Sequence, residues 1–157
     1  MDARADLLER ERDRWTRLRK LLVEVPPSRA EEPTLNPEGW SVRDLVWHMA
    51  CWNDVVAAQL NLMRAGAFDD RFEWNTEENN ARFLEAGRSI PLAQALASLE
   101  RSRTELVDAM ERLDDVPSRA LELFSEPAYK HADDHLPELR RFLGKDPPGD
   151  AEPIDGS

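Results

Sequence analysis

The chain has 157 residues, of which 41% are hydrophobic and 34% are charged, a composition typical of one globular domain. Its formal net charge of −11 argues against nucleic-acid binding, because that binding draws much of its affinity from basic side chains that meet phosphates. A single cysteine excludes a disulfide within the chain, and no apolar run approaches the roughly 20 residues that a membrane span needs.

Helical periodicity dominates the sequence from its first segment. Over residues 7–25 the apolar residues recur at steps of three and four, which predicts an amphipathic helix that ends at the adjacent prolines 26 and 27. A second helix is predicted from Ser41, whose hydroxyl can cap the first turn with Asp44 three residues on, to Gly66. His48 falls on the apolar stripe of this second helix and is expected to face inward.

A long link follows the second helix and has a weak helical pattern of its own. Residues 75–87, NTEENNARFLEAG, are predicted to form one or two helical turns. Ser89 and Pro91 have the residue types that favour a helix start, so the third main helix is predicted to begin there. Pro117 follows its end.

The last helix is predicted to be capped by Ser125, to have Pro127 in its first turn, and to run to about Gly144. Within it Pro137 lacks the amide that an inner helical turn uses, so a kink is expected there. Residues 144–157 include three prolines and four acidic residues and are expected to form a flexible tail.

Four amphipathic helices of this length predict an all-α fold, a four-helix bundle over residues 1–143 followed by the tail. The connections 25–40 and 64–90 are too long for tight antiparallel turns, so at least one is expected to cross the bundle. The sequence shows no internal repeat and no second domain.

Two of the three histidines stand one helical turn apart in HADDH, residues 131–135. Residues four apart share one face of a helix, so His131 and His135 can offer two imidazoles to one ion. His48 faces inward from another helix, and three imidazoles with an open position would make a catalytic type of metal site. The alternative is that each histidine is an ordinary core or boundary residue.

The stretch GWSVRDLVWHMACW, followed downstream by HADDHLPEL, resembles the DinB/YfiT-like superfamily. This superfamily includes the N-terminal domains of mycothiol-dependent maleylpyruvate isomerases and other thiol-dependent transferases. The resemblance covers residues 1–143 and implies a helical bundle in which His48, His131 and His135 hold a divalent metal. It implies neither DNA polymerase activity nor DNA binding.

The resemblance favours a small metal-dependent enzyme, a low-molecular-weight-thiol S-transferase or a hydrolase with a small-molecule substrate. One alternative is a stress-response protein that binds a metal or small molecule without turnover, and another is a structural bundle that associates through helix faces, for instance as a homodimer. Zinc or nickel is the expected ion, although imidazoles also accept copper or iron. No catalytic residue is assigned. We expect a cytoplasmic protein without nucleic-acid or membrane partners.

Several other polar side chains near the histidines have open interpretations. Cys51 is either a thiolate ligand or nucleophile, or a packed side chain. Asp44 is either a hydrogen-bond acceptor for an imidazole or only the helix cap. Asp133 is expected to be solvated, and Asp134 is either solvated or a base beside the ligands.

Two tryptophans are candidates for the walls of a pocket. Trp52 lies one turn beyond His48 and is expected to line such a pocket. Trp74 and Asn75 lie in the long link, where they either close over the metal site or belong to an ordinary packed loop.

Overall fold

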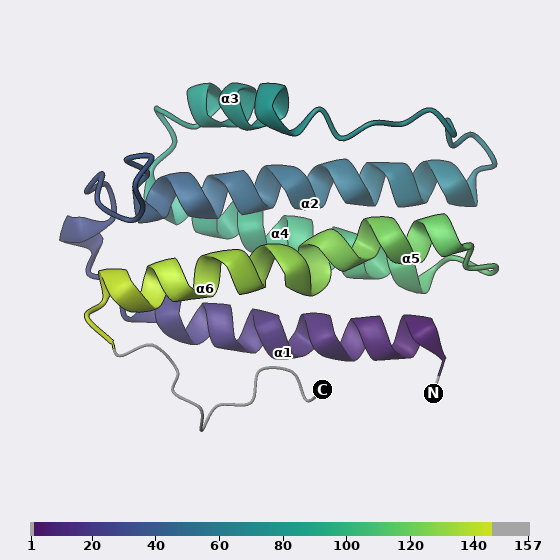
Figure 1. Ribbon diagram of the computed structural model, residues 1–157, viewed down its shortest axis with the longest axis horizontal. Helices are drawn as coiled ribbons and strands as arrows, with labels where there is room; N and C mark the ends of the chain where they lie inside the picture. The colour runs from purple at the N-terminus through teal and green to yellow at the C-terminus, as the bar shows by residue number, and fades with distance from the viewer. Residues whose placement is uncertain (1, 146–157) are drawn as a thin grey trace.

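The computed structural model describes residues 2–145, whose regular secondary structure is entirely helical, with no strand among them. The α-helices are α1 (Ala3–Val23), α2 (Val42–Arg64), α3 (Thr76–Ala86), α4 (Leu92–Glu111), α5 (Ser118–Ser125) and α6 (His131–Phe142). A short 3-10 helix, η1 (Pro27–Arg29), follows α1, and a π-helical turn, η2 (Glu126–Lys130), joins α5 to α6 (Figure 1). The predicted all-α bundle is confirmed, and residues 146–157 of the predicted tail lie outside the described part of the chain.

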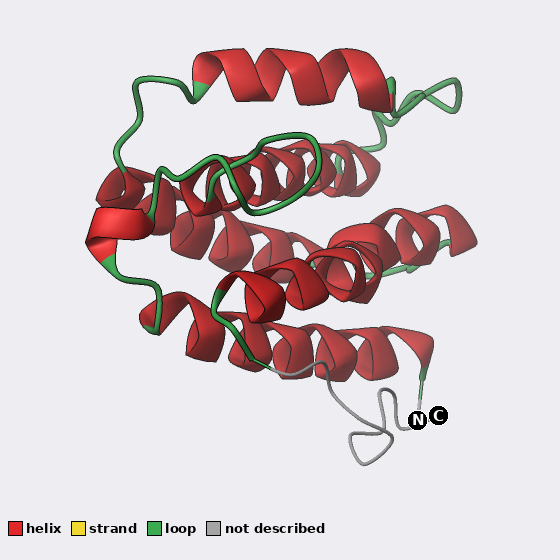
Figure 2. Cartoon of the chain, turned by 60° about the vertical axis from the view of Figure 1, so that its left-hand side comes forward, coloured by secondary structure: helices red, strands yellow, loops and turns green. Residues whose placement is uncertain are grey.

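Four long helical rods make the bundle, because α5, η2 and α6 follow one another without a break and act as one rod (Figure 1). The link from residue 65 to residue 91 runs back along the length of α2, and α3 lies within it over the outer face of that helix (Figures 1 and 2). As a result α4 runs parallel to α2, whereas α1 and the α5–α6 rod run in the opposite direction. The expected crossing connection is therefore the one after α2. None of the described helices is both long and apolar enough to cross a membrane.

The start of α2 follows from two side chains that satisfy each other's backbone amides. The Ser41 hydroxyl accepts a hydrogen bond from the Asp44 amide at 3.0 Å, and the Asp44 carboxylate accepts one from the Ser41 amide at 2.9 Å. This is the predicted capping box. The capping box supports the role of Asp44 as helix cap, and Asp44 also pairs with Arg43 at 3.3 Å.

The link helix α3 is longer than the one or two turns predicted, with 11 residues. It starts after Asn75, which has a left-handed backbone conformation with φ of 47°. It ends at Gly87, which lies so close to the Trp47 ring of α2 that a β-carbon there would clash with it. None of the 11 residues of α3 is buried, so contacts at its surface hold the helix to the bundle, including this one and the hydrogen bond from Trp52 to Asn80.

The predicted start of the last helix at Ser125 is wrong. The helical rod begins seven residues earlier, at Ser118, with Pro117 as its N-cap. Ser125 lies inside the rod, where its hydroxyl donates to the Glu122 carbonyl at 2.8 Å. The turns before Ser125 contribute a full apolar face to the core, with Phe124 completely buried.

The π-helical turn η2 coincides with Pro127. A proline inside a helix has no amide to donate and its ring crowds the carbonyl four residues earlier, so a wider turn relieves the conflict. The His131 amide bonds to the Glu126 carbonyl, five residues back, as a π turn requires. Pro127 therefore lies in the middle of a helical rod and not in its first turn.

The core consists of two apolar clusters, one toward each end of the bundle. The first joins the N-terminal halves of α2 and α4 to the ends of α1 and α6; the second joins their C-terminal halves to the start of α1 and to α5. Between the clusters the buried positions include polar side chains, which we call the polar layer: Glu11, Arg14, His48, Asn53 and Ser102. The polar layer marks the level of the bundle at which the histidines lie.

Candidate metal centre

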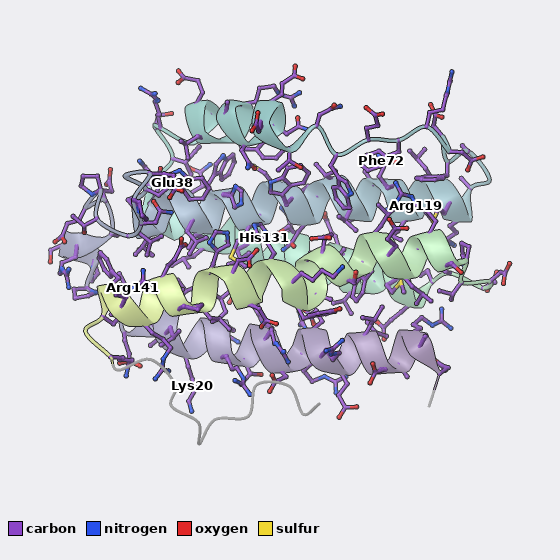
Figure 3. The ribbon with its side chains drawn as sticks, viewed as in Figure 1. Lys20, Glu38, Phe72, Arg119, His131 and Arg141 are labelled. Atoms are coloured by element: carbon purple, nitrogen blue, oxygen red, sulfur yellow. The ribbon has the colours of Figure 1, made fainter. Side chains whose placement is uncertain are left out.

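Three histidines converge in the polar layer. His48 comes from α2, and His131 and His135 come from the first two turns of α6; one ring nitrogen of each lies within 4.8 Å of those of the others. The Nε2 atoms of His48 and His131 are 2.7 Å apart. Figure 3 places His131 on the side of α6 that faces α2. The three imidazoles thus surround one small volume, and metal ligation by them stays a prediction.

The helices fix each imidazole through the burial of its neighbours. His48 is only 3% exposed and lies on α2 between Leu45 of the first cluster and Val56 of the second. His131 is the first residue after the π turn, and His135 follows one turn later on the same face. Because buried side chains anchor the rod both before and after η2, the rotation of the histidine pair toward α2 is set by packing on both sides.

A carboxylate orients His135. Its Nδ1 donates a hydrogen bond to Glu138 Oε1 at 2.6 Å, so in the neutral ring Nε2 is the nitrogen with the lone pair. Histidines that bind metals commonly have such a carboxylate partner on the second nitrogen. The ring of Trp40 stacks on His135 at 6.1 Å between centroids and meets His48 edge-on at 4.7 Å, which restricts both rings.

Burial keeps two of the imidazoles neutral. Desolvation lowers the pKa of His48 to about 2, with repulsion from His131 and His135 adding to the shift. Desolvation and the nearby His135 lower the pKa of His131 to about 3. At neutral pH both rings therefore keep a free lone pair, which is the form that binds metal ions.

The arrangement fits a cation better than it fits a closed hydrogen-bond network. The paired Nε2 atoms of His48 and His131 can share one proton at most, and His48 Nδ1 is buried without a hydrogen-bond partner in the described part of the chain. A cation shared by the three imidazoles would use the lone pairs that now face one another. The unpartnered Nδ1 departs from the usual arrangement, in which the second ring nitrogen donates to an acceptor.

A pocket of about 500 Å³ opens onto the histidines. All three histidines line it, together with three tryptophans, four carboxylates and a few neutral side chains from the N-terminal link, α2, α3 and the last rod. Trp52 lines the pocket as expected, and its indole N–H donates to Asn80 Oδ1 of α3 at 2.8 Å. Trp74 also lines it, with its ring 5.8 Å from that of Trp52, whereas Asn75 does not. The long link therefore forms one wall of the pocket.

The other candidate residues lie differently with respect to the pocket. Cys51 is outside its lining, and burial together with the nearby Asp54 raises the pKa of the thiol to about 11, so the structure favours packing for this residue. Asp134 is exposed and lines the pocket. Asp133 is not simply solvated as expected, because it accepts hydrogen bonds from the buried Arg14 of α1 at 3.0 and 3.3 Å. That ion pair joins α6 to α1 within the same helical turn as His131 and His135.

Sequence reasoning missed two residues that contact the histidines. Glu138 lies three residues after His135, and that helical spacing alone would have identified it as a partner. Trp40 introduces α2, but nothing in its spacing shows that its ring would cover His48 and His135. That placement depends on how the link between α1 and α2, residues 24–41, folds over the end of the bundle.

The chain matches the model of one protein family, described as the mycothiol maleylpyruvate isomerase N-terminal domain, over residues 10–124. The matched segment contains His48 and most of the bundle but ends before His131 and His135. No curated protein and no solved structure shows significant similarity to the chain.

Proposed function

Because the chain belongs to the mycothiol maleylpyruvate isomerase N-terminal domain family, and so to the DinB/YfiT-like superfamily, we propose that it binds a divalent metal through His48, His131 and His135. One observation carries the proposal: three imidazoles from two helices meet in the lining of a pocket, with one ring nitrogen of each within 4.8 Å of those of the others. Three protein ligands leave a coordination position for a small molecule.

The residues around the triad have separate tasks in this proposal. Glu138 holds the proton on His135 Nδ1 so that Nε2 points to the ion. Trp40 restricts the rings of His48 and His135 and covers them from the side of the N-terminal link. When bound, the ion would supply Lewis acidity, which lowers the pKa of a coordinated water or thiol.

We further propose that the reaction is a transfer to or from a low-molecular-weight thiol, with hydrolysis as the alternative. The family description names a thiol, mycothiol, and the pocket has room for a small molecule beside the triad. Cys51 lies outside the pocket lining, so a thiol that reacts there would come from the substrate. Maleylpyruvate fits this pocket poorly, because the described lining includes no lysine or arginine that could bind the second carboxylate of a dicarboxylate beside the proposed ion.

Metal content is the first test. Protein purified without a histidine tag, from cells grown with zinc, nickel, cobalt and iron, should contain close to one equivalent of metal by elemental analysis. His135→Ala should lose most of it, and the surface control Glu122→Ala, on the rod that carries the pair, should retain it. Wild-type protein that takes up no stoichiometric metal would refute the proposal.

Thiol binding is the second test. The cobalt-substituted protein should change its absorption when mycothiol is added, because the thiolate enters the ion's coordination shell, and His131→Ala should show no such change. If the metal-loaded protein does not bind thiols, the proposed thiol transfer is excluded. Hydrolysis, or sequestration of the metal without turnover, would then remain.

A further inference from the structure

Carboxylates dominate the charge of the pocket. Glu38, Glu126, Asp134 and Glu138 line it, and no lysine or arginine is found among its described lining residues. Lys130 approaches Glu126 at 3.7 Å, but both side chains are about half exposed, so solvent screens the contact. With four carboxylates present, the pocket would stay negative even beside a bound divalent ion. It therefore attracts cations and repels anions, in the same sense as the net charge of −11 of the chain.

Indole rings supply the rest of the wall. Trp40, Trp52 and Trp74 all line the pocket, and the face of an indole is the best aromatic partner of an organic cation. The Trp52 ring is held by its hydrogen bond to Asn80 and by edge contacts with Trp74 and with Phe83, at 5.8 and 5.3 Å between centroids. Its orientation is thus set before any ligand arrives, which lowers the entropic cost of binding.

One residue of the pocket lining has a buried nitrogen without a hydrogen-bond partner. His48 is 3% exposed, belongs to the pocket lining, and has a ring nitrogen without a partner among the described residues. A buried polar atom without a hydrogen bond is costly, and a bound ion or small molecule that completes the site is one explanation for it. This observation is independent of the carboxylates and the indoles.

We propose that the pocket takes a small organic cation, a molecule with a protonated amine or a quaternary ammonium group, held by the tryptophan faces and the carboxylates beside the histidine triad. The inference rests on the proposed function, since it names the substrate class of the same site. A dicarboxylate would meet only repulsion from the same side chains, whereas an ammonium group finds both charge and aromatic surface.

Three probes of equal shape and different charge test the proposal. Choline is the cation, 3,3-dimethyl-1-butanol is its neutral isostere, and 3,3-dimethylbutanoate is a matched anion. Binding is measured by calorimetry and by tryptophan fluorescence, on metal-free and on metal-loaded protein. We expect choline to bind at least about tenfold more tightly than the neutral alcohol, and the anion to bind most weakly. Equal affinities, or a preference for the anion, would overturn the proposal.

Two variants and a matched control locate the binding. Asp134→Asn removes one pocket charge from an exposed side chain, so it should fold normally and weaken choline binding several-fold. Asp115→Asn makes the same change at an exposed position outside the pocket and should leave the affinity unaltered. Trp52→Leu should reduce the preference for choline over the alcohol. Equal effects of Asp134→Asn and Asp115→Asn would show that net charge, and not the pocket, explains the preference.

The experiment separates this inference from the metal proposal. Elemental analysis of the same samples reports on the metal alone. Protein that holds no metal but prefers choline would refute the metal proposal and leave the cation site standing. Protein that holds metal and shows no preference among the three probes would refute the cation site and leave the metal proposal standing.

Discussion

Glu138 is a carboxylate in hydrogen-bond contact with a histidine of the triad. Its Oε1 accepts a hydrogen bond from His135 Nδ1 at 2.6 Å, and the Glu138 side chain is only 19% exposed. Glu138→Gln keeps the shape but replaces the carboxylate by an amide, so the His135 tautomer and ring orientation are held less firmly. We expect metal affinity to fall by about 10- to 100-fold, measured by competition with a chromophoric chelator. Glu122→Gln is the control, and equal affinities of the two variants would contradict the role of Glu138.

Cys51 offers a test of pH dependence away from the histidines. Burial and the nearby Asp54 raise the pKa of its thiol from 9.0 to about 11. We expect alkylation by iodoacetamide to be slow at pH 9 and to accelerate only as the pH approaches 11, because the thiolate is the reactive form. Rapid modification of folded protein at pH 8 would contradict this environment.

The same shift has a consequence for stability. The unfolded chain loses the thiol proton near pH 9, whereas the folded chain keeps it to about pH 11. The contribution of Cys51 is therefore fully present below pH 9 and is lost as the pH rises through 11. Cys51→Ala should have a flatter dependence of unfolding free energy on pH across this window, measured by urea denaturation.

At the level of single residues the sequence predicts which helix faces carry the histidines, but it does not predict most of the side chains around them. Helical spacing is enough to place His131 and His135 on one face and to put His48 on the buried face of α2. Trp40 and Trp74 lie in links whose sequences have no regular hydrophobic period. Their positions in the pocket are therefore visible only in the folded structure.

Among the helices, α1 is tied to α4 by a largely buried ion pair. Arg103 donates two hydrogen bonds to Glu11, at 2.8 and 2.6 Å, and the Glu11 side chain is only 6% exposed. Arg103→Met would leave that carboxylate buried without its partner, so we expect the unfolding free energy to fall by about 3 kcal/mol. The double variant Glu11→Leu with Arg103→Met should recover most of the loss, because no charge stays buried. These values come from urea denaturation.

A surface pair gives the matched control for that experiment. Arg101 bonds to Asp54 at 3.2 Å, but both side chains are about half exposed. Arg101→Met should therefore cost less than about 1 kcal/mol. Similar losses for Arg101→Met and Arg103→Met would show that burial of the Glu11 carboxylate is not what matters.

The last rod shows why the boundaries of helices were harder to predict than their existence. Ser125 followed by Pro127 has the pattern of a helix start, and a local pattern cannot distinguish that start from a π turn inside a longer helix. The burial of Phe124 decides the matter, because the turns before Ser125 must be helical to place that side chain in the core. Tertiary packing overrode the local signal.

Across the whole molecule, two apolar clusters enclose the polar layer that contains the candidate metal centre. An ion bound only by the folded chain adds stability by mass action, about 2.7 kcal/mol when its free concentration is 100 times its dissociation constant. We expect a chelator to lower Tm by roughly 5 to 10 °C while the helical circular dichroism at 25 °C is retained, because both clusters persist without the ion.

The control for the chelator experiment is His135→Ala, whose Tm should not respond to metal or chelator. Complete unfolding of the wild type in chelator would mean that the apolar clusters cannot hold the bundle alone.

The amphipathic stripes predicted four rods and one apolar interior. The division of that interior into two clusters, and the parallel course of α2 and α4, follow from the long returning link, whose path has no signal in the hydrophobic period.

The helix α3, which forms part of the pocket wall, is expected to be less stable locally than the four rods. None of its 11 residues is buried, so α3 should detach from the bundle at a lower free energy than the rods need to unfold. Its amides should exchange with deuterium well before those of α2. Since Asn80 and the adjoining Trp74 leave the pocket when α3 detaches, a bound ligand must suppress that opening. Ligand affinity and exchange protection of residues 76–86 are then linked quantities, and each tenfold of ligand concentration above the dissociation constant should slow exchange in α3 about tenfold.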